Sequence, residues 1–384
     1  MSGTPGANRR EFLAGKAAAE ALAAQAKRSD PNADASAATN GTGEGTTEET
    51  YLFQVSRRAM ACDFALFLNA DRAVGIPDET LESLEYLDVL EDQMSVYRAH
   101  SEVSQINRLA GREPVMVERR LFGLLQQALA ISEATHGAFD ITSSPLSRAW
   151  GFWRREGRMP TADELETALA AVGWRNVELD PNASTIRFLR SDVEINLNAI
   201  GKGHALDRCA ERIMNGEADD SVEPSETTRS DSGNVRNFVI HGGQSSILAR
   251  GSRGGFDGWW VALRNPLRPE QRLIEFCLRD QALGTSGSGT QFFYHGGKRY
   301  GHVIDPRSGR PADCVLSATV LAPTAAEADA LATAFYVLGA EASGAYCASH
   351  PSIAALLIVP GAREGGVEVL PLNLQESQWR RVDR

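Results

Sequence analysis

Asp329 and Thr333 are the residues whose types and spacing point most directly to chemistry. Thr324, followed three residues later by Glu327, has the pattern of a capping box, which predicts that a helix begins at about Ala325. In a helix, a spacing of four places the Asp329 carboxylate and the Thr333 hydroxyl on one face. Such oxygen ligands suit a hard cation such as Mg²⁺. The alternative is a solvated aspartate beside a threonine that hydrogen-bonds back to its own helix.

A second candidate is the turn Gly201-Lys202-Gly203. It follows a predicted strand over 193–197 and opens a predicted helix that extends to about Met214. Glycines allow the backbone to come close to a ligand, and the N–H groups at a helix start favour an anion. Lys202 adds a point charge suited to phosphate. An ordinary tight turn with a solvated lysine remains the alternative.

Paired glycines follow another predicted strand, over 238–240. Gly242 and Gly243 stand directly after His241. At the end of a strand, two glycines allow either a β-bulge or the close packing of a flat ligand. The residues alone do not decide between these two interpretations.

A third candidate is the segment 284–289, which consists of glycine, serine and threonine and is predicted to be a loop. Its backbone N–H groups and Ser286 could face a phosphate. Further along, His302 precedes a short predicted strand and could act as a general base or contact a pyrophosphate. A purely structural histidine is the alternative for His302.

The segment 137–152 is predicted to be mainly architectural, with one substrate contact at most. Asp140 and Thr142 could cap a turn, and Trp150 and Phe152 have the character of core residues.

Apolar periodicity predicts the elements that must position these residues, starting at Tyr51. Helices and strands do not alternate regularly, which indicates an α+β fold. The predicted helices are 81–90, 119–135, 161–172, 201–214 and the helix from 325. The predicted strands are 51–55, 64–68, 177–179, 185–189, 193–197, 238–240, 259–263, 273–278, 303–304, 318–321 and 353–359.

Composition excludes several classes of function. The 384 residues carry a net charge of −11 without a Lys/Arg-rich run in the folded part, so nucleic-acid binding is not expected. No apolar stretch approaches eighteen residues, so no transmembrane helix is expected. Five widely spaced cysteines form no CxxC pattern, which argues against a disulfide framework or a zinc site.

The first 50 residues differ in kind from the remainder. Arg9-Arg10, followed by Glu-Phe-Leu, has the twin-arginine export pattern, and 24–26 could be a cleavage site. The segment 27–49 is rich in small polar residues and is predicted to be a disordered linker. These features predict a periplasmic or cell-envelope location, with a cytoplasmic protein carrying a disordered tail as the alternative. Within the folded part, 51–384, a flexible insertion is predicted over 216–234.

The order of these motifs resembles that of the FAD:protein FMN transferase family, also called ApbE-like flavin transferases. The resemblance covers about 51–372 of the chain. The matching positions are Met60, Ser95-Val-Tyr97, Ser101-Glu102, Asn107, Gly137–Thr142, Pro145, Trp150-Gly-Phe152, Gly201-Lys-Gly203, Asp207, Gly242-Gly243, Trp260, Asn265-Pro266, Ser286-Gly287, His302–Pro306 and Ala328–Thr333.

The resemblance implies a two-lobed α+β fold with mixed or antiparallel sheets and FAD in the cleft between the lobes. It implies Mg²⁺-dependent cleavage of FAD, attachment of FMN through a phosphoester to a Thr or Ser of a partner flavoprotein, and release of AMP. Catalytic roles are implied for His302 and Lys202, and metal ligation for Asp329, Thr333 and a backbone carbonyl near Gly201. The implied flavin-nucleotide contacts are Met60, Tyr97, Asn107, Asp207, Gly242, Gly243, Ser286, Gly287 and His302.

The chain departs from the usual family pattern at several positions. Met60 is followed by Ala and Cys in place of Gly and Thr. Asn196 and Gln244 replace carboxylates, and Asn198 replaces a glycine. The lost negative charge leaves two alternatives beside the transferase: an FAD pyrophosphatase that passes FMN to water, and a non-catalytic FAD-binding protein.

Overall fold

The computed structural model describes residues 50–71, 76–216, 235–287, 289, 291–363 and 365–382. The twin-arginine pattern, the predicted linker and nearly all of the 216–234 insertion lie outside the described residues. In the described part, no helix has both the length and the apolarity to cross a membrane.

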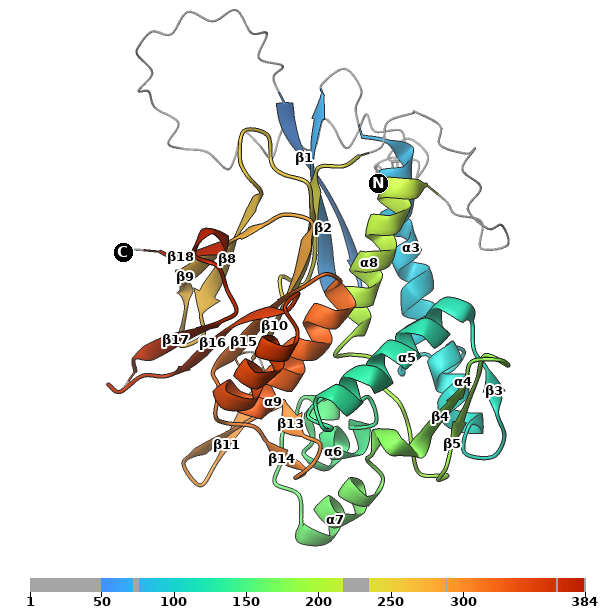
Figure 1. The fold of residues 1–384 in the computed structure, drawn as a ribbon. Coiled ribbons are helices and arrows are strands. Elements are labelled where there is room, and N and C mark those ends of the chain that lie inside the picture. Colours follow the sequence, from blue (N-terminus) through green and yellow to red (C-terminus); the bar gives the residue numbers. More distant parts are fainter. Residues whose placement is uncertain are drawn as a thin grey trace, which may run out of the picture. The chain divides into compact units, whose positions relative to one another are not determined.

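An eight-stranded antiparallel sheet forms the centre of the folded part (Figure 1). Its strands pair in the order β1-β2-β6-β7-β10-β15-β16-β17. Their bounds are β1 Thr50–Ala59, β2 Cys62–Asp71, β6 Phe238–Gly242, β7 Ser246–Arg250, β10 Gln281–Gly287, β15 Ser317–Ala322, β16 Ala354–Pro360 and β17 Val367–Leu372.

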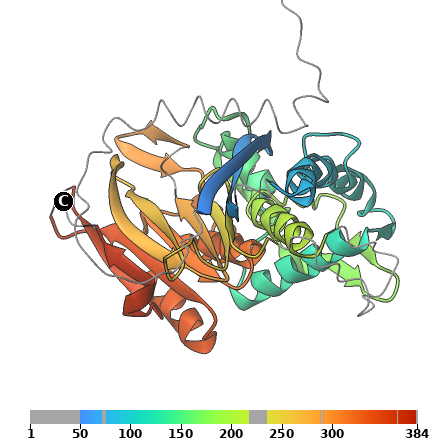
Figure 2. The same ribbon diagram turned by 90° about the horizontal axis from the view of Figure 1, so that it is seen from above.

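Helices cover one face of this sheet and stand beside it. Figure 2 shows the blue-to-green helical region on one side and the yellow-to-red strands on the other. The helices are α3 Asp78–Met94, α4 Glu102–Leu109, α5 Arg119–Ala134, α6 Ser144–Ala149, α7 Ala162–Ala170, α8 Gly201–Asn215 and α9 Ala325–Ser349. Short 3₁₀ turns occur at Phe152–Arg154, Trp174–Asn176 and Glu376–Gln378.

Smaller sheets complete the fold. The first joins β18 (Trp379–Arg381), β9 (Arg268–Leu278) and β8 (Trp259–Asn265), and the second joins β3 (Val115–Met116), β5 (Thr185–Phe188) and β4 (Val177–Asp180). Two hairpins pair β11 (Phe292–His295) with β12 (Lys298–Gly301), and β13 (Ile304–Asp305) with β14 (Arg310–Pro311). The predicted hairpin around residue 180 is confirmed by the pairing of β4 with β5.

The central sheet is buried on both faces. Successive residues of a strand point to opposite faces. Val320 joins the core shared with the helices, whereas Leu321 joins a second core with β8 and β9. Leu357 and Leu356 divide in the same way. This arrangement of helices and antiparallel sheets confirms the predicted α+β fold class.

Two predicted elements are wrong. Val193, Ile195 and Leu197 are buried in alternation, yet no strand forms over 193–197. Instead, the Asn107 side chain satisfies the backbone of Ile195, accepting from its N–H at 2.7 Å and donating to its carbonyl at 2.9 Å. The second error is the predicted loop 284–289, most of which belongs to the interior strand β10. The small residue is required by packing and does not mark a loop. Strand β10 lies so close to α9 that a Cβ on Gly284 would be 2.4 Å from the Ala328 carbonyl oxygen.

Candidate active site

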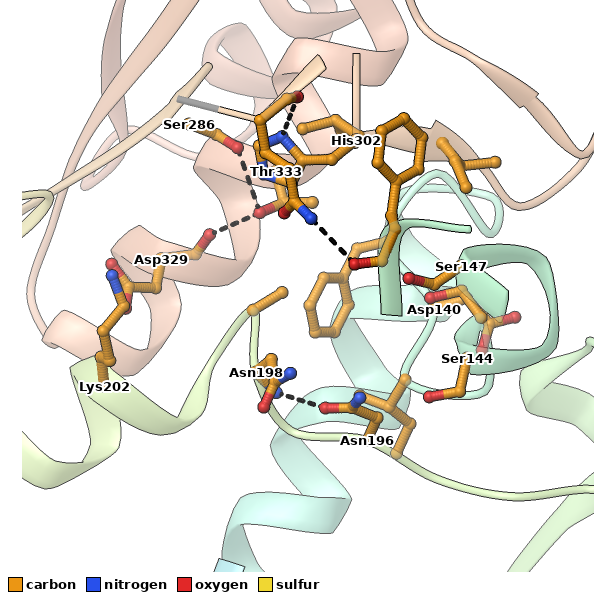
Figure 3. Close-up of a pocket in the computed structure, with 18 of the residues that line it drawn as sticks. Asp140, Ser144, Ser147, Asn196, Asn198, Lys202, Ser286, His302, Asp329 and Thr333 are labelled. Atoms are coloured by element: carbon orange, nitrogen blue, oxygen red, sulfur yellow. Dashed lines mark hydrogen bonds between the residues drawn. The ribbon is translucent and has the colours of Figure 1, made fainter. Parts of the chain in front are cut away.

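A cavity of about 430 Å³ brings together residues from parts of the fold that are far apart in the sequence. Asp329 and Thr333 of α9, Ser286 of β10 and Lys202 of α8 lie on one side of the close-up in Figure 3. The opposite side carries polar groups of α6 and of the segment before α8, namely Ser144, Ser147, Asn196 and Asn198. The cavity therefore has a carboxylate, a lysine and several hydroxyls on facing walls.

Helix α9 begins where the sequence predicts, although its cap differs from the prediction. The Thr324 hydroxyl accepts from the Glu327 N–H at 3.3 Å, which is half of the predicted capping box. The Asp207 carboxylate accepts from the next two donors, Ala325 N–H at 2.8 Å and Ala326 N–H at 2.9 Å. Asp207 therefore caps α9. It does not line the cavity, so the structure does not place it where the resemblance implies a flavin contact.

Asp329 is buried and held in a fixed orientation. Its Oδ2 accepts from the Gly203 N–H at 2.9 Å and from the Ser246 hydroxyl at 2.7 Å. Burial raises the pKa of Asp329 to about 7, against the opposing charge of Lys202. The alternative of a solvated aspartate is therefore wrong.

Thr333 lies beside Asp329, as the spacing of four predicts. Its hydroxyl donates to the Asp329 carbonyl oxygen at 3.3 Å, so the predicted bond back to the helix is present. The same hydroxyl lies 3.5 Å from the Ser286 hydroxyl across the cavity wall (Figure 3). The Thr333 hydroxyl thus contacts both the backbone of its own helix and a side chain of the cavity wall.

The donor set fits a hard cation. The Asp329 carboxylate and the hydroxyls of Thr333 and Ser286 are oxygen ligands of the kind that Mg²⁺ prefers. No group of three His, Cys, Asp or Glu side chains that could hold a metal occurs in the described part of the chain. These oxygens therefore suit Mg²⁺ better than zinc.

The glycines of the Gly-Lys-Gly turn pack helices together. A Cβ on Gly203 would lie 2.0 Å from the Ala325 carbonyl oxygen, so this glycine permits α8 to cross α9. Gly201 is buried against Met94 and is not among the residues that line the cavity. Lys202 does reach the cavity, where its amine hydrogen-bonds the Ser245 hydroxyl.

His302 lines the same cavity and has a defined ring orientation. Its Nδ1 lies 3.2 Å from the Gln291 carbonyl oxygen, and Gln291 Nε2 donates to the Phe152 carbonyl at 2.8 Å. Burial lowers the pKa of His302 below its ordinary value. With Nδ1 engaged as donor, Nε2 is the nitrogen able to accept a proton.

Comparison with known proteins identifies the family. The model of the ApbE family matches residues 60–222 and 226–357. The chain belongs to the ApbE family. It is 28% identical over 322 residues to an FAD:protein FMN transferase of Haemophilus influenzae, covering 81% of this chain and 88% of that protein. It is 31% identical over 278 residues to one of Vibrio cholerae, covering 71% and 77%.

Solved structures agree with this assignment. The flavin transferase ApbE from Vibrio cholerae superposes with a TM-score of 0.70 at 25% identity, covering 86% of this chain and 98% of that chain. The ApbE protein of Thermotoga maritima gives a TM-score of 0.69 at 25% identity, covering 83% and 96%.

Tyr97 and Trp153 form an aromatic wall of the cavity. Tyr97 is 64% exposed, and its ring centroid lies 4.9 Å from that of Trp153. The ApbE resemblance indicates Tyr97 but not Trp153, which stands beside the predicted core residues Trp150 and Phe152. The sequence signal for Trp153 is its place in that aromatic cluster. Asp140, also on the wall, accepts from Thr142 and from the Trp174 N–H, so its predicted capping role is confirmed.

Four further residues for which the ApbE resemblance implies a flavin contact do not line the cavity. Met60 stands in the β1–β2 turn with a φ of 49°, and its N–H donates to Glu91 at 3.0 Å. The Asn107 amide hydrogen-bonds the backbone of Ile195 in the 193–197 segment. Gly242 lies against Phe64, whose ring a Cβ would approach at 2.8 Å, and Gly243 adjoins Cys62. In contrast, Ser286, Gly287 and Tyr97 do line the cavity.

The amide substitutions fall in two places. Asn196 and Asn198 line the cavity, and the Asn196 Oδ1 accepts from the Asn198 N–H at 2.8 Å. Gln244 is exposed in the β6–β7 turn with a φ of 63° and is not among the lining residues. The cavity wall therefore lacks a carboxylate at Asn196 where the ApbE pattern usually has one.

Proposed function

We propose that this protein is an Mg²⁺-dependent FAD:protein FMN transferase. It would cleave the pyrophosphate of FAD, attach FMN through a phosphoester to a Thr or Ser of a partner flavoprotein, and release AMP. The enzyme class rests on membership of the ApbE family and on the transferase names of the relatives. The observation that carries the chemistry is the meeting of Asp329, Thr333, Lys202 and His302 at one cavity.

Asp329 and Thr333 would hold the Mg²⁺ ion, with the Ser286 hydroxyl beside them. When bound, the ion would neutralise charge on the pyrophosphate oxygens, which is the main demand of phosphoryl transfer. Lys202 adds a second positive charge on the same wall. Because Ser245 holds its amine, that charge is fixed in position before the substrate arrives.

His302 would accept the proton of the incoming hydroxyl. The acceptor oxygen would form a bond to the phosphorus of the FMN half as the bond to the AMP oxygen breaks, and AMP would leave as a phosphate monoester. Burial favours the neutral imidazole, which is the form able to take a proton. Tyr97 and Trp153 provide flat apolar surfaces suited to an aromatic ring of FAD.

The test compares the wild type with Asp329→Asn, which keeps the shape of the side chain but removes its charge. Each protein is incubated with FAD, Mg²⁺ and an acceptor domain from a flavinylated protein, and nucleotides and protein-bound flavin are separated. We expect AMP and covalent flavin in equal amounts with the wild type, and a loss of about 1000-fold in the variant. AMP with only free FMN would support the pyrophosphatase, and no AMP at all would support a non-catalytic FAD-binding protein.

A location in the cell envelope is part of this proposal and is supported by the twin-arginine pattern. Replacing Arg9 and Arg10 by lysine should retain the protein in the cytoplasm in a fractionation experiment. An unchanged distribution would favour the cytoplasmic alternative.

A further inference from the structure

A second cavity, of about 330 Å³, adjoins the opposite face of α8. Lys202 lines the candidate active site, whereas His204 lines this second cavity. Two residues along an α-helix are about 200° apart, so the two side chains leave α8 in opposite directions. Residues of α5 form the facing wall, and Figures 1 and 2 both place α5 beside α8.

The walls of this cavity carry an excess of positive charge in a chain whose net charge is −11. Three arginines, Arg120, Arg208 and Arg250, line it together with two carboxylates, Asp207 and Glu211. Both carboxylates are already engaged. Asp207 accepts from two backbone N–H groups at the start of α9, and Glu211 pairs with Arg208. The same pair engages Arg208, while Arg120 donates to the Tyr86 hydroxyl and Arg250 to the Ala249 carbonyl oxygen, both neutral acceptors. Three arginines against two carboxylates leave the lining with a net charge of +1, which favours an anion.

Two neutral polar side chains face the same space. His204 and Gln127 line the cavity, and neither side chain has a hydrogen-bond partner among the described residues. Burial lowers the pKa of His204 to about 4, so its ring is neutral and can donate one N–H. Together they supply donors beside the arginines.

Gly123 lines the same cavity from α5. It lies in the interior of α5, where glycine is less favourable than alanine. Packing does not require it, since a Cβ at this position would have no heavy atom within 4 Å. The missing side chain leaves the cavity open between α5 and α8.

We propose that this second cavity is a binding site for a phosphate group, carried by inorganic phosphate or by a small phosphate monoester. A guanidinium forms paired hydrogen bonds with phosphate oxygens, and Arg250 and Arg120 approach from β7 and α5. The volume admits a phosphate with a small attached group. The site is separate from the catalytic cavity, and the proposal does not depend on the transferase assignment.

Calorimetric titration tests the proposal with two probes, inorganic phosphate and ribose 5-phosphate. We expect saturable binding to the wild type. Arg250→Gln removes one guanidinium, and Gly123→Leu fills the cavity; each should weaken binding at least tenfold. The probe with the lower Kd shows whether free phosphate or a phosphate monoester is the preferred ligand.

Lys202→Ala is the matched control, because it alters the catalytic cavity on the other face of α8. Its phosphate affinity should equal that of the wild type. The proposal is overturned if no saturable binding occurs, or if binding is lost in Lys202→Ala and retained in both other variants. Melting temperatures confirm folding, and if Arg250→Gln fails to fold, Gly123→Leu decides the question alone.

Discussion

The backbone N–H of Gly203 donates to Asp329 Oδ2 at 2.9 Å and so joins the start of α8 to the carboxylate of α9. This bond is possible because the two helices cross where Gly203 has no side chain. It leaves Oδ1 as the carboxylate oxygen able to face the cavity. The position of Lys202, the next residue back along α8, is fixed by the same crossing.

Gly203→Ala tests this crossing. The new Cβ would lie 2.0 Å from the Ala325 carbonyl oxygen, so the helices must separate. We expect a loss of about 1–3 kcal/mol in the free energy of unfolding, measured by urea denaturation. Gly123→Ala is the control, since its Cβ meets no atom within 4 Å; it should stabilise the fold by about 1 kcal/mol. Equal effects of the two substitutions would contradict the role of the crossing.

Thr333→Val removes the hydroxyl while keeping the shape of the side chain. We expect transferase activity to fall about 100-fold, because one oxygen ligand for Mg²⁺ is lost. The free energy of unfolding should change by less than about 1.5 kcal/mol, since only two long contacts of the hydroxyl disappear, to the Asp329 carbonyl oxygen and to the Ser286 hydroxyl. Thr333→Ser keeps the oxygen and should retain most of the activity. Full activity of Thr333→Val in limiting Mg²⁺ would exclude this residue as a ligand.

Burial raises the pKa of Asp329 to about 7, so the pH dependence of kcat/KM is measured at saturating Mg²⁺, which would keep this carboxylate ionised. Under that condition the profile should report on His302. Burial disfavours the imidazolium and lowers the pKa below 6.5, so the neutral base persists below that pH. Activity should therefore be level near pH 7 and decline tenfold per unit only below the lowered pKa. In His302→Gln this acidic limb should vanish and the rate should fall about 10²–10⁴-fold. An acidic limb centred above pH 6.5 would refute the assignment.

Local patterns predicted the metal-site candidates, because they depend on helical spacing alone. The start of α9 and the shared face of Asp329 and Thr333 follow from residues within one segment. The Asp207 cap was not predictable, since its partners at Ala325 and Ala326 are more than a hundred positions away. Its match to the family pattern implied a flavin contact, whereas its carboxylate caps the start of α9.

The two misassigned segments show why composition misleads. The residues of 284–289 are typical of loops, yet Gly284 belongs to a strand because α9 packs on the missing side chain. The alternation of Val193, Ile195 and Leu197 correctly predicted which side chains are buried. It could not reveal that no neighbouring strand is available, since pairing depends on the whole sheet.

Asn107 provides the last test, because its amide takes the place of a strand partner for Ile195. Asn107→Ala leaves a buried N–H and carbonyl unsatisfied, so we expect a loss of about 1–3 kcal/mol in the free energy of unfolding. The segment that this substitution releases contains Asn196 and Asn198, which line the cavity. Because these side chains would no longer be held in place, KM for FAD should rise. Asn107→Asp still accepts from the Ile195 N–H at its Oδ1 position and should lose less stability than Asn107→Ala. A raised KM with unchanged stability would instead indicate that Asn107 contacts FAD directly, as the family pattern implies.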